Sequence, residues 1–316
     1  MPHPRTRTAR AAIAGAAVLL AAALGTAAPA AAQTSYKVNY SWSNAFATSL
    51  DPGKAPPGAN DWSCAPSAAH PRPVVLVHGT FENQANNWQG AAPILANHGY
   101  CVFSFNYGGS ALSGPVMGIE KIEDGAAQLA AFVDRVRAAT GTDKVDLVGH
   151  SQGGMMPRYY LKNLGGAAKV HTLVGITPSN HGTDLDGIAE LGKLIGVIGP
   201  VSAACPACGE QIQGSSFLTA LNAGGDTVPG VSYYTIVTKN DEVVTPYTSG
   251  ELTGPNTTNV VLQDQCRLDQ SDHLEAPYSP VVLHLVLNAL DPDHPGPVPC
   301  QVVLPLTGPT GPVTGS

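Results

Sequence analysis

The sequence has little positive charge. Lysine and arginine number 16 against 23 aspartate and glutamate residues, and charged residues make up only 12% of the 316 residues. An acidic chain of this kind is not expected to bind nucleic acid. An apolar stretch at residues 11–24 is too short to span a bilayer, so no integral membrane association is expected either. No internal repeat is visible.

The first residues have the layout of a secretory signal peptide. Three arginines precede the apolar stretch, and an alanine triplet follows it. We expect residues 1–32 to be removed before Gln33, which leaves 33–316 as one secreted, extracellular and monomeric domain with a Pro/Gly-rich tail. Because the leader carries three arginines and no acidic residue, its loss changes the formal charge from −7 to −10. The tail after Pro292 is too rich in proline for helix or central strand, and we expect it to wrap the surface and fray at its end.

Six cysteines lie in the mature part of the chain, and an even number in an exported protein implies disulfides. We expect neighbours in the sequence to pair: Cys64 with Cys101, Cys205 with Cys208, and Cys266 with Cys300. The C-x-x-C spacing of the second pair also occurs in redox and zinc sites. No βαβ start follows it and no second ligand pair is near, so a small structural loop is favoured. No metal or other cofactor is expected.

Apolar runs that suit buried strands alternate with segments of helical spacing. Strands are expected at 73–77, 101–107, 145–148, 170–176, 232–237 and 259–263, and helices at 119–140, 155–163 and 280–290. Strands that alternate with helices over this length predict the α/β class. The sheet is expected to be mostly parallel and covered by helices on both faces.

Residues 149–153 read Gly-His-Ser-Gln-Gly and directly follow the apolar run 145–148. A strand that ends in G-x-S-x-G and leads into a helix forms a sharp turn that holds the serine out at the edge of the sheet. Gly149 and Gly153 fill the two places where a Cβ would clash. A glycine-rich loop could produce this pattern by chance, but the strand before it and the helix after it favour Ser151 as a nucleophile. Pro157 is expected near the first turn of that helix.

A serine hydroxyl needs a base within hydrogen-bond reach and a carboxylate that holds the base in the right tautomer. In this fold the order along the chain is Ser, acid, His. His273 lies in the loop between the last strand and the closing helix, where such a base is expected. His171 and His181 precede any suitable acid, while His284 lies in the closing helix and His294 in a surface turn.

The acid is expected just beyond a strand, on the same rim as the serine. Asp241 follows the strand at 232–237 and is favoured over the adjacent Glu242 because it lies closer to the strand.

The oxyanion of the tetrahedral intermediate needs backbone N–H donors, one from the residue after the nucleophile and one from the loop after the first strand. These are Gln152 and Thr80, whose hydroxyl could give a third hydrogen bond. Phe81 is the competitor if the register shifts by one. His78 and His150 are interpreted as orienting or packing residues.

Four segments together resemble the secreted bacterial triacylglycerol lipases of the α/β-hydrolase superfamily, lipase class 2. They are Val75-Leu76-Val77-His78-Gly79-Thr80, Gly149-His150-Ser151-Gln152-Gly153-Gly154, Asn240-Asp241-Glu242-Val243-Val244-Thr245-Pro246 and Asp272-His273-Leu274. The glutamine after the serine and the threonine after His-Gly are also similar to the fungal lipase-B type. The resemblance covers nearly the whole mature chain.

This resemblance implies the α/β-hydrolase fold and a lipid or ester substrate. Residues 177–183 resemble the T-P-x-x-G segment of these lipases, which borders the substrate cleft, so Thr177 and His181 join Phe81 as candidates for substrate binding. Relatives with structural calcium often carry an acid and a glutamine just after the catalytic histidine. Here Glu275 is followed by proline and tyrosine, which disfavours a calcium site. The disulfide between Cys266 and Cys300 is expected to fix the histidine loop instead.

Apolar residues between 182 and 231 could line an acyl pocket, form a lid or simply face the core. A short-chain esterase or a polyester hydrolase would use the same mechanism as a lipase, and only the shape of the cleft separates them. An acyltransferase needs an acceptor site that nothing here identifies. A non-catalytic binding protein would more naturally have lost one of Ser151, Asp241 and His273.

Overall fold

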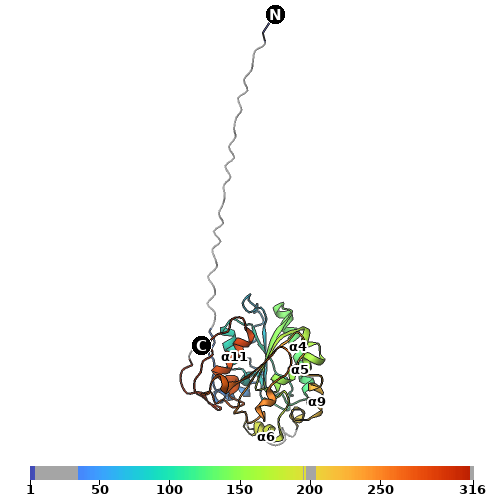
Figure 1. Ribbon diagram of the computed structural model, residues 1–316, viewed down its shortest axis with the longest axis vertical. Helices are drawn as coiled ribbons and strands as arrows, with labels where there is room; N and C mark the ends of the chain where they lie inside the picture. Colours follow the sequence, from blue (N-terminus) through green and yellow to red (C-terminus); the bar gives the residue numbers. More distant parts are fainter. Residues whose placement is uncertain (4–34, 195, 197–203, 314–316) are drawn as a thin grey trace. The chain divides into compact units, whose positions relative to one another are not determined.

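The computed structural model describes residues 1–3, 35–194, 196 and 204–313 (Figure 1). The chain divides into two units, Met1–Gln33 and Thr34–Ser316. The predicted signal peptide lies almost wholly outside the described residues. Every element below belongs to the second unit. In the part of the chain that the structure describes, no helix has the length and apolar character needed to cross a bilayer.

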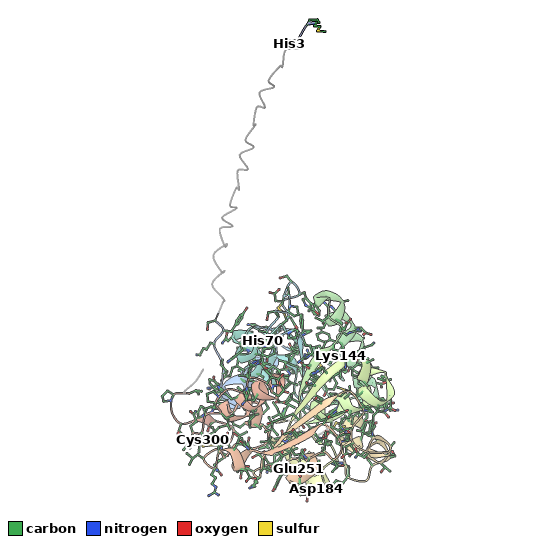
Figure 2. All side chains as sticks on the ribbon, turned by 45° about the horizontal axis from the view of Figure 1, so that its top comes forward. His3, His70, Lys144, Asp184, Glu251 and Cys300 are labelled. Atoms are coloured by element: carbon green, nitrogen blue, oxygen red, sulfur yellow. A yellow bond between two sulfur atoms is a disulfide. The ribbon has the colours of Figure 1, made fainter. Side chains whose placement is uncertain are left out.

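Six parallel strands form one sheet in the order β2-β1-β3-β4-β5-β6. Their bounds are β1 (Val74–Val77), β2 (Val102–Ser104), β3 (Val145–His150), β4 (Val170–Ile176), β5 (Ser232–Val237) and β6 (Thr257–Val261). In Figure 2, His70 and Lys144, which precede β1 and β3, lie at one end of the sheet, and Asp184 and Glu251, which follow β4 and β5, lie at the other. All carboxyl ends therefore meet at one edge.

Helices cover both faces of this sheet, as predicted. Alternate residues of a strand point to opposite faces. Accordingly, Val75 and Val77 enter one apolar core, and Val74 and Leu76 enter another. Helices of the first core are α4 (Ile122–Thr140) and α5 (Gln152–Asn163), and those of the second are α3 (Ala91–Asn97) and α11 (Pro280–Leu290), on opposite sides of the sheet in Figure 1. Burial on both faces explains the unbroken apolar run of β1.

Shorter helices join these elements. The α-helices are α1 (Trp42–Ala45), α2 (Gln84–Asn87), α6 (Leu185–Leu194), α8 (Pro206–Glu210), α9 (Ser216–Asn222) and α10 (Leu262–Gln265). The 3-10 helices are η1 (Phe46–Leu50), η2 (Gly166–Ala168), η3 (Tyr247–Gly250) and η4 (Ala276–Tyr278). Helix α6 lies in the segment predicted to line an acyl pocket, form a lid or face the core.

Several helices and strands begin or end at other residues than predicted. Helix α5 begins at Gln152 instead of residue 155, so Pro157 lies in the second turn and leaves the carbonyl of Gly153 without its helical donor. Strand β2 covers only the start of the predicted 101–107, and the N–H of its last residue, Ser104, donates to the side chain of Asn60 at 2.8 Å. Strand β6 lies two residues earlier than predicted, because residues 262–265 turn into α10.

All three predicted disulfides are present: Cys64–Cys101, Cys205–Cys208 and Cys266–Cys300. The second pair closes the first turn of helix α8, where a loop was expected.

The tail wraps the surface, as predicted, and adds a small antiparallel pair, β7 (Val303–Leu304) and β8 (Gly308–Pro309). The carbonyl of Leu306 accepts a hydrogen bond from the Ser43 N–H at 2.9 Å. The predicted fraying concerns the last residues, of which 314–316 lie outside the described chain.

Candidate active site

Ser151 occupies the turn between β3 and α5, with φ 54° and ψ −123°. A positive φ is rare for a residue with a Cβ and marks strain that the surrounding structure must hold. A Cβ on Gly149 would overlap the carbonyl of Gly153, and one on Gly153 would overlap the carbonyl of Val77. The N–H of Ser151 donates to the carbonyl of Ile176 at 3.0 Å, which ties the turn to β4. The two glycines and this bond hold the sharp turn that the motif predicts.

His273 pairs with Asp241. Its Nδ1 lies 3.0 Å from the Asp241 carboxylate, and the backbone N–H groups of Val243 and Val244 donate to the same carboxylate at 3.0 and 2.7 Å. Burial opposes a charge on His273, but the neighbouring carboxylates, Asp241 first, raise the pKa of the imidazole above its usual value. The carboxylate only accepts, so Nδ1 carries a proton and Nε2 presents its lone pair.

The imidazole of His273 lies beside the serine turn. Its ring centroid is 5.0 Å from that of His150, the residue before Ser151, and Nε2 of His150 donates to the His273 carbonyl at 3.0 Å. Nε2 of His273 is buried without a hydrogen-bond partner in the described structure, and the Ser151 hydroxyl makes no hydrogen bond there either. A hydrogen bond from the Ser151 hydroxyl to Nε2 of His273 would give each of these atoms a partner. Catalytic hydrogen bonds of this kind often tighten only when substrate is present.

Thr80 and Gln152 present two free backbone donors. The N–H of Phe81 donates to the Met117 carbonyl at 2.8 Å and is therefore occupied, which favours Thr80 in the oxyanion role. The Thr80 and Gln152 N–H groups have no acceptor among the described residues, as expected for the first residue of a helix in the case of Gln152. The side chains of Thr80 and Gln152 also meet, with Oγ1 of Thr80 donating to Oε1 of Gln152 at 2.6 Å.

His78 cannot serve as a base. Its Nε2 accepts from the Tyr107 N–H at 3.3 Å, its Nδ1 donates to the Gly79 carbonyl at 2.9 Å, and its ring stacks on Tyr107 at 4.4 Å. Burial lowers the pKa of His78 to about 4. The ring is neutral and fully engaged, in agreement with a packing role.

The predicted substrate residues differ in availability. Phe81 is buried with φ 66°. Thr177 has φ 43° and a buried hydroxyl without a hydrogen-bond partner in the described structure. His181 is committed elsewhere, with Nδ1 3.0 Å from the Ser249 carbonyl and Nε2 3.1 Å from the Asp226 carboxylate. The geometry therefore favours Thr177 over His181.

Three more residues lie near the site, and two of them, Glu82 and Gln211, were not identified from the sequence. Glu82 is buried and lies 2.8 Å from Nδ1 of His150. Gln211 is buried and donates to the Thr80 hydroxyl at 2.9 Å. Glu242, the alternative acid, accepts from the backbone N–H of His273 at 3.3 Å, and burial raises its pKa to about 7.

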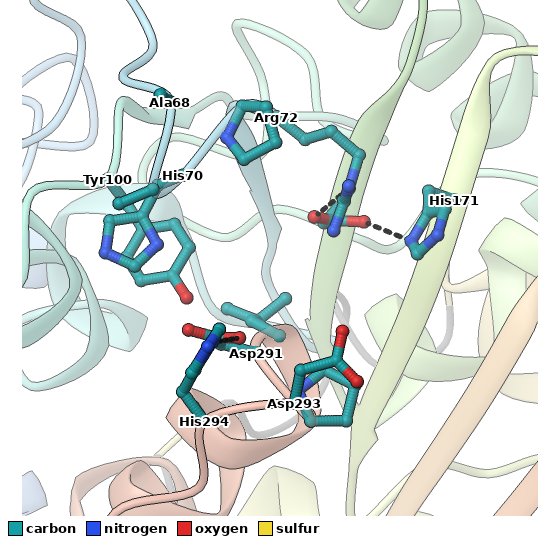
Figure 3. Close-up of a pocket in the computed structure, with 13 residues that line it drawn as sticks. Ala68, His70, Arg72, Tyr100, His171, Asp291, Asp293 and His294 are labelled. Atoms are coloured by element: carbon teal, nitrogen blue, oxygen red, sulfur yellow. Dashed lines mark hydrogen bonds and ion pairs between the residues drawn. The ribbon is translucent and has the colours of Figure 1, made fainter.

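A separate hollow of about 580 Å³ lies at the amino ends of the strands, away from the serine turn (Figure 3). Several of its charged side chains pair with each other. Arg72 lies 2.9 Å from Asp146, His171 lies 3.5 Å from the same carboxylate, and His294 lies 3.0 Å from Asp291. This hollow contains none of the predicted catalytic residues. Within the described ranges, no group of three or more His, Cys, Asp or Glu side chains is arranged to hold a metal ion.

The chain has relatives among curated proteins. Two curated relatives, triacylglycerol lipases of Pseudarthrobacter phenanthrenivorans and Burkholderia plantarii, are each 41% identical over 101 residues. These matches cover 29% of this chain and only 28% and 25% of the two relatives, so the chain aligns with about a quarter of their length.

Solved structures share the fold. Aspergillus fumigatus lipase B superposes with a TM-score of 0.61 at 21% identity, covering 78% of this chain and 57% of that one. The mature form of Bacillus licheniformis lipase BlEst2 gives 0.52 at 18% identity, covering 75% and 96%. Together with the six-stranded parallel sheet and its two helical layers, these likenesses identify the α/β-hydrolase fold. The model of the lipase (class 2) family matches residues 71–284, more than half of the sequence, and the chain belongs to that family.

Proposed function

We propose that this protein is a secreted serine hydrolase that cleaves the carboxylic esters of triacylglycerols. The observation that carries the proposal is the His273–Asp241 pair, 3.0 Å apart, with Nε2 of His273 unpaired beside the strained serine turn. In this pair Asp241 fixes the tautomer, and Nε2 is left to take a proton.

The reaction proceeds through an acyl-enzyme. Nε2 of His273 takes the proton of Ser151 while Oγ forms a bond to the ester carbon, and the carbonyl electron pair moves onto oxygen. The N–H groups of Thr80 and Gln152 stabilise that oxyanion. The electron pair then returns, the C–O bond to the alcohol breaks, and the leaving alcohol takes the proton from His273. Water repeats the same steps, which releases the carboxylic acid and restores the serine.

The substrate class and the location rest on separate support. Both curated relatives bear the name triacylglycerol lipase. Three disulfides and the layout of the first residues support export. The chain supplies every group that the reaction needs, so the proposal includes no metal or cofactor, and we expect chelation with EDTA to leave the rate unchanged.

The test begins with Ser151→Ala and the matched control Ser110→Ala, an exposed loop position. We expect only Ser151→Ala to lose hydrolysis of p-nitrophenyl esters and labelling by a fluorophosphonate probe. Wild-type rates in Ser151→Ala would overturn the proposal. Esters of increasing acyl length, together with emulsified triglyceride, then separate the alternatives. A rate that collapses beyond short chains would replace the lipase by a short-chain esterase of the same mechanism.

A further inference from the structure

Three buried polar side chains form a small network next to Ser151. Nε2 of Gln211 lies 2.9 Å from Oγ1 of Thr80 and 3.4 Å from Oε1 of Gln152, and the Thr80 hydroxyl bridges to the same Gln152 oxygen at 2.6 Å. Each of the three residues is about 1% exposed. Two of them carry the backbone amides proposed to hold the oxyanion, and the third has no place in the mechanism above.

The surroundings of Gln211 fix which way its amide points. Its Nε2 faces the side-chain oxygen Oε1 of Gln152 and the backbone carbonyl of Ala207, the latter at 3.2 Å. Its Oε1 accepts from the Ser179 hydroxyl at 2.9 Å. A flipped amide would place an oxygen against two acceptors. Gln211 therefore donates to Thr80 and cannot accept from it.

Helix α8 holds Gln211 firmly in this place. The residue follows the last residue of the helix, whose first turn is closed by the Cys205–Cys208 disulfide. The side chain of Glu210 accepts from the Ile122 N–H at 2.8 Å. The backbone carbonyl of Gln211 itself accepts from the Thr183 N–H at 3.0 Å.

Without substrate, the Thr80 hydroxyl donates its proton within this network. A threonine hydroxyl has one proton to donate and two lone pairs to accept with. The Thr80 proton is committed to Oε1 of Gln152, so the hydroxyl must rotate before it can donate to an oxyanion. The rotation would leave the Gln152 oxygen without this donor, in a buried place where an unpaired acceptor is costly.

We propose that Gln211 is a positioning residue that makes this rotation possible. Nε2 of Gln211 holds Oγ1 of Thr80 in place while the hydroxyl proton turns from Gln152 to the oxyanion. The same Nε2 stays beside Oε1 of Gln152 and replaces the Thr80 hydroxyl as its donor. The rotation exchanges hydrogen bonds only, with no proton transfer and no covalent bond broken. Gln211 acts through Thr80 and does not touch the substrate. This inference rests on the proposed function and on the third hydrogen bond to the oxyanion that the Thr80 hydroxyl is expected to give.

The test compares Gln211→Met, which keeps the length but loses the N–H donor, with Gln211→Glu. A carboxylate at this position would accept the Thr80 proton and withhold it from the oxyanion. We expect kcat to fall about tenfold in Gln211→Met, further in Gln211→Glu, and KM to stay within a factor of two in both. Gln213→Met is the control, because that exposed side chain bonds only to the Thr245 carbonyl. Gln211→Asn, which keeps the amide but shortens its reach, replaces Gln211→Met if the latter does not fold.

A double-mutant cycle decides the route. In a Thr80→Val background the hydroxyl is gone, so Gln211→Met should lower kcat far less, because only its contact with Gln152 is left to lose, whereas a Thr80→Ser background should keep the full effect. The inference would be overturned if Gln211→Met lowered kcat equally in the Thr80→Val background, or if it did not lower kcat in the otherwise wild-type protein. An inactive Ser151→Ala would still uphold the proposed function in that case. A fully active Ser151→Ala would overturn both.

Discussion

Glu82 and His150 form a buried pair directly behind the proposed catalytic histidine. Oε2 of Glu82 lies 2.8 Å from Nδ1 of His150, with the two side chains 2% and 1% exposed. The short contact requires a proton on one of these two atoms. Nε2 of His150 donates to the backbone carbonyl of His273. The pair therefore connects the loop after β1 to the loop that carries the proposed base.

Removing Glu82 should loosen that connection. Glu82→Ala leaves Nδ1 of His150 with the Asn87 side chain at 3.1 Å as its remaining partner. We expect a loss of about 0.5–1.5 kcal/mol in the free energy of unfolding, the usual net contribution of one intramolecular hydrogen bond. We also expect kcat to fall while KM holds, because the His273 backbone shifts. Thermal unfolding and steady-state kinetics measure both. Asp143→Asn, at an exposed position, is the control, and equal behaviour of the two variants would refute the role of the pair.

The pH profile should report the raised pKa of His273. The base must be neutral to take the serine proton, so activity should decline as the pH falls through a value above the usual histidine pKa of about 6.5. Asp241→Asn should reduce kcat by roughly 10³–10⁴-fold and move this limb to lower pH. Glu242→Gln is the matched comparison. It removes a carboxylate that contacts only the backbone of His273, and it should move the limb slightly with little loss of kcat. Equal damage from both would contradict the assignment of the acid.

The sequence was most informative where residue types favour one kind of element. Strands β4 and β5 and helix α11 have the predicted bounds, because both strands are rich in β-branched and aromatic residues and because Pro280 and the Ser279 cap mark a helix start. The serine turn could also be predicted from the sequence, since only glycine fits at positions 149 and 153.

Contacts between distant segments left no such pattern. Gln211 meets Thr80 across 131 residues and Glu82 meets His150 across 68, and neither polar side chain follows a helical or strand period. The end of β6 was missed for a related reason. Leu262 and Gln263 extend the run of the strand in the sequence, but they are buried as the first turn of α10. Only the packing of the folded chain decides between these two states.

The buried carboxyl of Glu275 should make stability fall with rising pH. Burial, with Asp272 and Asp269 nearby, raises the pKa of Glu275 to about 9, above its unfolded value of 4.5. The folded state therefore holds a proton that the unfolded state releases. This contribution is complete below pH 4.5 and is lost progressively as the pH rises toward 9. Glu275→Gln should flatten that slope and increase the free energy of unfolding at pH 8 by on the order of 1–3 kcal/mol. Denaturant titrations at pH 5 and pH 8 measure it, with Glu251→Gln as control. An unchanged slope would contradict a protonated Glu275.

The disulfide Cys266–Cys300 should matter for activity as well as stability. It joins the segment before His273 to the tail, where the Gln270 N–H donates to the Val303 carbonyl at 2.9 Å. Its loop of 34 residues is close in length to the 37 of Cys64–Cys101, so the chain-entropy model gives each about 3–4 kcal/mol. Paired serine replacements should lower stability alike in the two cases. Only the loss of Cys266–Cys300 should also lower kcat at a temperature where both variants are folded. Equal kcat values would show that the bond does not hold the histidine loop.

Gly149→Ala should prevent the serine turn from forming. The added methyl would overlap the backbone carbonyl of Gly153, and neither strand β3 nor helix α5 can move aside without breaking the sheet or the packing of its helical layer. Overpacking of this kind costs about 1–3 kcal/mol where side chains can yield, and backbone contacts yield less. We expect insoluble protein, or a folded fraction that fluorophosphonate does not label. Gly209→Ala is the control, because a Cβ there meets nothing within 4 Å and its φ is not left-handed. It should fold and react as wild type. A Gly149→Ala protein with normal labelling would mean that the strained conformation of Ser151 is not what brings its hydroxyl to the probe.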